Sequence, residues 1–209
     1  DEHFHPVVEA GSLHLWRQEW PILAERGPNA AIEIGGGLAA RGLGMEANDE
    51  PVPMVEPARD RSTHVAVELR DTPVDLRFQL LIYPVTDGTM TRPSIDANAD
   101  GYFLTKDTMD WFWEQYMGAG DRTDPRVSPM HLPDDALTGL PPALIITAEY
   151  DPLRDEGEAY GARLVGAGVP VTTSRYDGVI HGFFSMRDVV PEGKAAVDQA
   201  CEALRRACG

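Results

Sequence analysis

Asp151 and His181 are two residues whose types and order could carry acid–base chemistry in this chain. A carboxylate that holds an imidazole in place turns it into a general base, which can deprotonate a hydroxyl for attack on a carbonyl carbon. The order Asp then His, about 30 residues apart, matches the second and third members of such a triad. The first member should be a serine in a G-x-S-x-G turn, and this chain contains no such motif.

Three predicted strands would bring these two residues to one edge of a sheet. Residues 78–83 and 143–148 are nearly continuous apolar runs, as expected of strands buried on both faces. Residues 171–176 form a more polar strand, which we expect nearer to a sheet edge. Asp151 follows the second strand and His181 lies in the loop after the third. In a parallel sheet both positions fall at the carboxyl edge, where α/β proteins place their sites.

Helical patterns alternate with these strands, which indicates a parallel sheet with helices on its faces. Thr105 can cap a helix that carries a wide apolar stripe over residues 109–117. Residues 155–167 and 191–207 predict two further helices. We therefore expect one α/β domain over residues 1–209, built on a mostly parallel sheet with helices on both faces.

A long irregular stretch, residues 86–104, separates the first predicted strand from the predicted helix that Thr105 caps. It is rich in Thr, Asp, Asn, Pro and Gly. Loops of this length are uncommon in compact domains unless they form lids or binding loops. We therefore expect this stretch to contribute to a binding site.

Six short runs between Leu76 and Cys208 occur in an order that is hard to obtain by chance. They are Leu80-Leu81-Ile82-Tyr83-Pro84, Gly101-Tyr102-Phe103-Leu104-Thr105, Asp124-Pro125-Arg126-Val127-Ser128-Pro129, Gly139-Leu140-Pro141-Pro142-Ala143, Asp151-Pro152-Leu153-Arg154-Asp155-Glu156 and His181-Gly182-Phe183. In these runs the chain resembles the hormone-sensitive-lipase-like group of α/β-hydrolases, which includes bacterial carboxylesterases. The resemblance covers close to two-thirds of the chain.

The resemblance implies an α/β-hydrolase-type fold and hydrolysis of small-molecule carboxylic esters. In its terms Asp151 is the orienting acid and His181 the general base of a Ser-His-Asp acyl-enzyme mechanism. It also implies that residues 86–130 form a partial cap over an apolar acyl pocket. Residues 2–6 are similar to a segment that follows the early strands of these enzymes, so we expect the fold to lack N-terminal strands and the H-G-G-G oxyanion motif.

The first third of the chain offers two alternative positions for the nucleophile elbow. In one, residues 31–34 are the strand before the elbow and residues 35–40 resemble the segment after the nucleophile, so the serine is absent. In the other, residues 55–59 precede that strand, and residues 60–63 must contain both strand and elbow. Neither alternative yields a strand–Ser–helix turn.

Ser62 is the candidate nucleophile that the second alternative leaves. The competing interpretation is an ordinary polar residue at a helix start. Ser128 and Ser185 lie in the family-like part, but neither occupies an elbow position. The glycines at 35–37 suit a flexible turn better than an oxyanion loop, because in the family that loop precedes the segment matched by residues 2–6.

The charge of the chain argues against two classes of partner. With 34 acidic and 18 basic residues, the formal net charge is −16, which argues against binding to nucleic acid phosphates and to anionic membrane surfaces. No run approaches the ~20 apolar residues of a membrane span. Solubility by itself is a sufficient reason for such acidity.

The cysteines indicate a reducing compartment. Cys201 and Cys208, the only two, lie two turns apart in the last predicted helix, a separation of ~10.5 Å that a disulfide cannot bridge. Since no signal peptide is visible either, we expect a cytoplasmic location. No Cys/His cluster has zinc-ligand spacing and no phosphate-binding loop occurs, so we expect neither a metal nor a cofactor.

Two functions and one artefact remain open at this stage. The first function is a carboxylesterase whose nucleophile cannot be read. The second is a non-catalytic fragment or pseudoenzyme of the same fold that binds acyl ligands or a partner; a sheet without several strands would expose an edge that favours homo-oligomers. The artefact is a frameshift or misassignment across residues 9–62, which would explain why only the ends of that interval look family-like.

Overall fold

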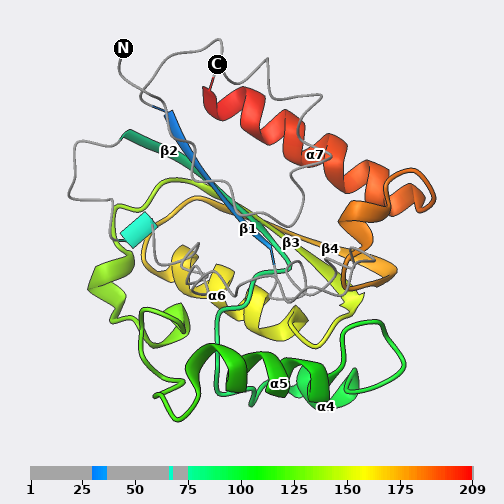
Figure 1. Ribbon diagram of the computed structural model, residues 1–209. Helices are drawn as coiled ribbons and strands as arrows, with labels where there is room; N and C mark the ends of the chain where they lie inside the picture. The colour runs from blue at the N-terminus through cyan, green and yellow to red at the C-terminus, as the bar shows by residue number, and fades with distance from the viewer. Residues whose placement is uncertain (1–29, 37–65, 68–74, 209) are drawn as a thin grey trace, which may run out of the picture.

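Four parallel strands form the sheet in the part of the chain that the computed structural model describes, residues 30–36, 66–67 and 75–208 (Figure 1). The strands are β1 (Ala30–Gly36), β2 (Asp75–Ile82), β3 (Ala143–Tyr150) and β4 (Val171–Ile180). They pair in the order β1-β2-β3-β4, and each pair is parallel. All four carboxyl ends therefore lie at the same edge.

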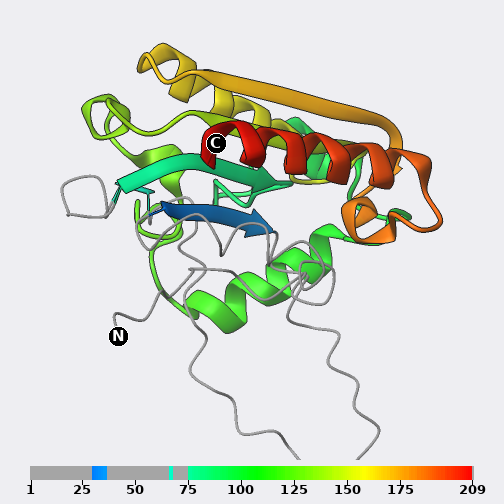
Figure 2. The same cartoon turned by 90° about the horizontal axis from the view of Figure 1, so that it is seen from above.

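Helices cover both faces of this sheet, as predicted. The helix α7 (Pro191–Cys208) lies on one face and α6 (Arg154–Gly166) on the other (Figure 1). Seen from above, α7 runs along β2, with β1 beside it (Figure 2). The 3₁₀ turns at Pro129–His131, Asp134–Leu137 and Phe183–Met186 complete the connections.

The apolar runs of β2 and β3 divide their side chains between the two helical layers. Leu80 and Ile146 pack in a core cluster with Ala196, Ala200 and Leu204 of α7. The alternate positions Leu81 and Ile145 pack in a second cluster with Tyr160 and Leu164 of α6. Because successive strand residues point to opposite faces, a nearly continuous apolar run is what a two-sided core requires.

The more polar strand, β4, lies at an end of the described sheet, as expected. Its pairing partner is β3, and Thr172, Thr173 and Arg175 are exposed. The strand extends to Ile180, four residues beyond the predicted end. His181 therefore follows the strand directly instead of lying further along a loop.

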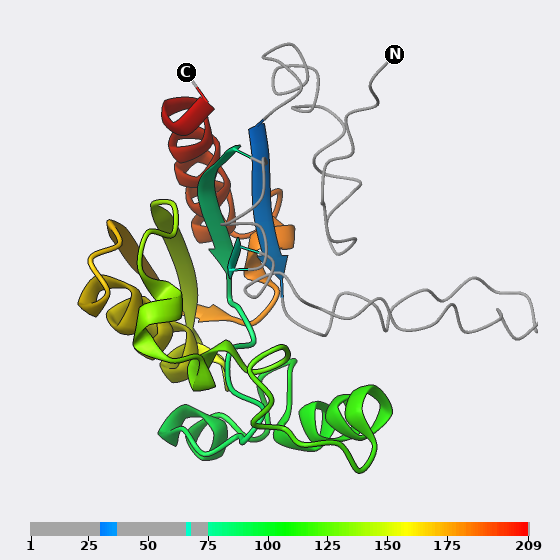
Figure 3. The ribbon, with the colours of Figure 1, turned by 90° about the vertical axis from the view of Figure 1, so that its left-hand side faces the viewer.

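The helices α4 (Pro93–Ala97) and α5 (Lys106–Met117) lie beyond the carboxyl ends of the strands (Figure 3). The cap of α5 is the predicted one, since Thr105 Oγ1 accepts the N–H of Thr108 at 3.1 Å. Helix α4 corrects the expectation that residues 86–104 are irregular throughout. Pro93 fits the first helical position, and Asp155 Oδ2 accepts the N–H of Ser94 at 2.8 Å. The hydrogen bond comes from Asp155 of α6, 61 residues away in sequence, so no local pattern could reveal it.

Candidate active site

The predicted acid and base meet at the carboxyl edge of the sheet. Asp151 is the first residue after β3, and its Oδ2 lies 2.8 Å from His181 Nδ1. Both side chains are buried, with exposed fractions of 0% and 2%. Asp151 Oδ1 accepts the N–H of Leu153 at 2.9 Å, which orients the carboxylate. Because an ionised carboxylate only accepts, the proton belongs on Nδ1, and Nε2 keeps the lone pair that a general base needs.

The loop that carries His181 is shaped by Gly182 and two aromatic anchors. Gly182 has φ 88°, a left-handed conformation that favours glycine. Phe183 and Phe184 follow, and each is 1% exposed. The chain therefore turns away from the sheet immediately after the histidine, and the buried rings hold that turn in the core.

Tyr83 lies against the imidazole, a contact that the sequence did not predict. The ring centroids of Tyr83 and His181 are 4.3 Å apart at an interplanar angle of 51°. Tyr83 was expected to end the first predicted strand, but it follows β2 and has φ 37°. Burial and the nearby charge of Asp151 raise the pKa of Tyr83 well above its usual range, so the phenol is neutral.

Asn98 is a second residue of the site that sequence reasoning missed. Its Nδ2 donates to the backbone carbonyl of Asp151 at 3.1 Å, and its side chain is buried. Asn98 directly follows α4 and lies in the stretch that we expected to contribute to a binding site. A buried amide among exposed polar residues of a loop carries no sequence signal of its own.

The strand β1 brings a further segment to the same edge. Its last residue, Gly36, pairs with Ile82, so β1 ends beside the last residue of β2, directly before Tyr83. This corrects the interpretation of residues 35–37 as a turn, because Gly35 and Gly36 belong to the strand. It also agrees with the first alternative, in which residues 31–34 are a strand.

Ser62 lies outside the described residues. Residues 37–61, which follow β1, contain no Ser, Thr or Cys, so Ser62 is the first hydroxyl or thiol after that strand. Ala66, four residues later, is helical and packs in the cluster on the α6 side of the sheet.

Neither a metal centre nor a membrane span is found in the described residues. No group of three or more His, Cys, Asp or Glu side chains is arranged there to hold a metal ion. In the same residues, no helix combines the length and apolarity that crossing a membrane requires.

Comparison with a protein-family model decides the lineage. Residues 62–185 match the family described as alpha/beta hydrolase fold. The chain belongs to the α/β-hydrolase fold family. The resemblance found in the sequence is thereby confirmed, and so is the fold class of this α/β-hydrolase.

Three of the similar proteins are named as esterases or ester hydrolases. This α/β-hydrolase is 40% identical over 131 residues to an ethyl acetate hydrolase of Pseudomonas putida, covering 62% of the present chain and 41% of that protein. It is 38% identical over 193 residues to carboxylesterase NlhH of Mycobacterium tuberculosis, a match that covers 90% of the present chain and 57% of that protein. It is 44% identical to the crystal structure of a thermostable esterase from Pseudomonas putida ECU1011, with a TM-score of 0.68 over 71% and 48% of the two chains. The present α/β-hydrolase thus spans about half the length of the relatives it matches.

Proposed function

We propose that this chain belongs to an enzyme that hydrolyses small-molecule carboxylic esters through an acyl-enzyme. A serine hydroxyl attacks the ester carbonyl carbon, and its proton passes to His181 Nε2 while Asp151 stabilises the imidazolium. The tetrahedral intermediate expels the alcohol, which takes the proton from His181. Water then attacks the acyl-enzyme with His181 again as base, which releases the carboxylic acid and restores the serine.

The observation that carries this proposal is the buried contact of 2.8 Å between Asp151 and His181. Burial of both groups excludes water, so the carboxylate interacts more strongly with the imidazole than it would at a surface. Relatives named as ethyl acetate hydrolase and carboxylesterase support the same reaction class. Neither a metal nor a cofactor has a part in these steps.

For the nucleophile we propose Ser62. It is the first hydroxyl after β1, and Ala66, four residues later, packs in the core cluster with Leu81 and Ile145. For residues 86–130 we propose a cap over the acyl pocket within a single domain of residues 1–209. The position of α4 and α5 beyond the carboxyl ends of the strands supports this cap (Figure 3).

The experiment is turnover of p-nitrophenyl acetate by the purified chain and by three variants. We expect His181→Ala and Ser62→Ala to abolish turnover and labelling by an organophosphonate, because each removes a member of the triad. Ser174→Ala, on β4 away from the site, should retain both. Turnover that survives His181→Ala would overturn the proposal, and labelling that survives Ser62→Ala would reassign the nucleophile.

The alternative function is a non-catalytic binding module. It is favoured by one observation, the lack of any Ser, Thr or Cys in residues 37–61 directly after β1. In that case the wild-type chain neither turns over the ester nor reacts with the phosphonate. Saturable binding of a non-hydrolysable acyl ligand, measured by calorimetry, would then support the alternative.

We propose a cytoplasmic location and self-association as two further properties. Cys201 and Cys208 both lie in α7, two turns apart, a separation of ~10.5 Å that a disulfide between them cannot bridge, and this suits a reducing compartment. The end strand β4 has exposed residues, and such an edge can pair with another chain. Cell fractionation tests the location, and sedimentation over a range of concentrations tests the oligomer.

A further inference from the structure

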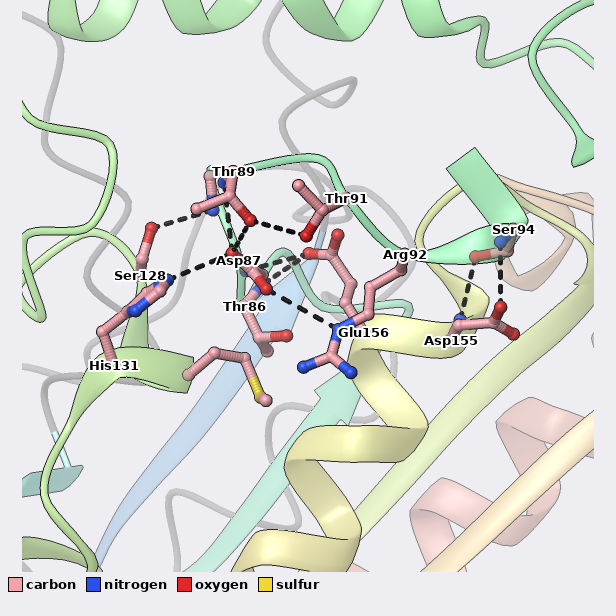
Figure 4. Close-up of polar contacts among 12 residues, drawn as sticks. Thr86, Asp87, Thr89, Thr91, Arg92, Ser94, Ser128, His131, Asp155 and Glu156 are labelled. Atoms are coloured by element: carbon pink, nitrogen blue, oxygen red, sulfur yellow. Dashed lines mark hydrogen bonds and ion pairs between the residues drawn. The ribbon is translucent and has the colours of Figure 1, made fainter. Parts of the chain in front are cut away.

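Glu156 is a buried carboxyl group that the reaction above does not use. It lies five residues after Asp151, in the first turn of α6, and its exposed fraction is 0%. Its Oε1 accepts the N–H of Thr86 at 2.7 Å and the N–H of Asp87 at 3.1 Å (Figure 4). Glutamate is almost never fully buried unless it is paired, so this position calls for a specific reason.

These hydrogen bonds fix the turn that follows β2. The chain leaves the strand through Tyr83, whose φ of 37° is strained for a residue with a side chain. Three residues later it reaches Thr86 and Asp87, where Glu156 holds the backbone. A Cβ on Gly157 would lie 3.3 Å from Pro84 Cδ, so the start of α6 packs directly on this turn.

The turn matters because the Tyr83 ring is in contact with His181. A left-handed residue returns to a relaxed conformation when the backbone around it is released, since that conformation persists only where the surroundings impose it. Release of the turn would therefore move the Tyr83 ring from its place 4.3 Å from the imidazole. Glu156 opposes this release from α6, beside the backbone hydrogen bonds from Tyr83 N–H to the Ile146 carbonyl and from Met130 N–H to the Thr86 carbonyl.

We propose that Glu156 is a positioning residue for His181, which acts by fixing the turn at Thr86 and Asp87 and so holding the Tyr83 ring against the imidazole. The consequence for catalysis rests on the proposed esterase function. The consequence for the geometry of His181 does not.

The neighbouring Asp155 forms different hydrogen bonds from Glu156, so the contacts of the two carboxyl groups can be told apart. Asp155 Oδ2 accepts the N–H of Ser94, and Ser94 Oγ accepts the N–H of Asp155 at 3.1 Å (Figure 4). Ser94 Oγ also donates to the carbonyl of Pro152 at 2.6 Å. This clamp ties α4 to the start of α6, whereas the bonds of Glu156 tie the turn after β2.

The electrostatic surroundings make Glu156 a neutral acceptor at pH 7. Burial, and the charges of Asp87 and Asp151, raise the pKa of Glu156 to about 8, against the lowering effect of its two hydrogen bonds. The carboxylate of Asp87 already has two partners, since its Oδ2 lies 3.6 Å from Arg92 Nε and its Oδ1 lies 3.2 Å from His131 Nε2. A glutamine, with the same shape and an uncharged acceptor oxygen, therefore imitates the native state of Glu156.

The first test compares turnover by Glu156→Ala and Glu156→Gln. We expect the alanine variant to lose about 10-fold to 100-fold in kcat, the cost of a small displacement of a reacting group, with little change in KM. The glutamine variant should keep most of the wild-type kcat. Glu158→Gln is the matched control, because Glu158 is on the same helix but bonds to Thr147 and Arg175.

The second test needs no turnover. The hydrogen-bonded Nδ1–H proton of His181 gives a far-downfield NMR signal, which His181→Gln assigns. We expect Glu156→Ala to shift or broaden it and Glu156→Gln to preserve it. In a Tyr83→Ala background Glu156→Ala should add no further change, because the two residues act in series.

The outcomes separate the inference from the proposed function. If the wild type has no esterase activity but the His181 signal responds to Glu156→Ala, the function fails and the inference stands. If Glu156→Ala folds, as judged by circular dichroism, and leaves both kcat and the signal unchanged, the inference is overturned. Additive effects of Glu156→Ala and Tyr83→Ala would also overturn it. If the alanine variant does not fold, loss of the His181 signal in the folded Glu156→Gln variant would contradict the inference.

Discussion

The Phe103 ring packs against Gly182, the residue that follows the candidate general base. A Cβ built on Gly182 would lie 3.4 Å from Phe103 Cε1. Gly182 has φ 88°, and Phe103 itself is left-handed, with φ 42° and a side chain that is 55% exposed. Two unusual backbone conformations thus meet beside His181, as is common at functional sites.

We predict that Gly182→Ala lowers both stability and turnover. A left-handed alanine costs about 1–2 kcal/mol, and its methyl group would lie against the Phe103 ring, so relief of the backbone strain would also move that contact. Urea denaturation measures the first effect and ester turnover the second. Gly101→Ala is the control, because Gly101 has φ 86° but no atom within 4 Å of the added methyl group. Equal effects of both variants on turnover would contradict a role for the Phe103 contact.

Asp151→Asn should lower kcat by about 10⁴-fold without unfolding the protein. An asparagine oxygen can still accept the N–H of Leu153, so the loop after β3 is kept. It cannot hold His181 in the tautomer with the proton on Nδ1 as a carboxylate does. Asp177→Asn, on the exposed part of β4, is the control and should behave as the wild type. Activity of Asp151→Asn within tenfold of the wild type would contradict the assigned role.

The raised pKa of Glu156 predicts that stability falls as the pH rises. Its ordinary pKa of 4.5 becomes about 8 in the folded chain, so between these values the folded state binds a proton that the unfolded state has lost. The free energy of unfolding should therefore decrease over this window, by up to about 1.4 kcal/mol per pH unit from this group. Above pH 8 no further loss is expected.

Glu156→Gln tests this pH dependence, because an amide does not titrate. Urea denaturation from pH 5 to pH 9 should give a flatter stability profile for the variant than for the wild type. Glu158→Gln, whose side chain lies two residues further along α6, should keep the wild-type slope. Parallel profiles for Glu156→Gln and the wild type would show that Glu156 ionises normally.

Two glycines of α6 should respond oppositely to alanine. A Cβ on Gly161 would lie 2.9 Å from both Ile145 Cδ1 and Thr173 Oγ1, so Gly161→Ala overpacks the contact between helix and sheet. We expect a loss of about 1–3 kcal/mol. Gly166 has open space around it, and Gly166→Ala should stabilise by about 0.4–1 kcal/mol. Thermal unfolding of both variants checks the pair.

Much of the fold could be predicted because its patterns are local. The apolar runs that became β2 and β3, the polar strand β4 and the cap at Thr105 each occupy a few consecutive residues. Element ends were less accurate, since β4 continues to Ile180 and α4 interrupts a stretch expected to be irregular. Those details depend on contacts with α6 and β3, which a local window does not contain.

The sequence by itself determined the resemblance to the α/β-hydrolases, the acidic charge and the order of Asp151 before His181 at the ends of two strands. Parallel pairing then brings these residues together across 30 positions of chain, as strand order makes predictable. The contact of Tyr83 with His181, the bond from Asn98 and the bonds of Glu156 to a turn 70 residues away were decided only by the tertiary structure. Each depends on how the chain turns after a strand and on where a helix packs. Neither the turn nor the packing position produces a periodic pattern of residues in the sequence.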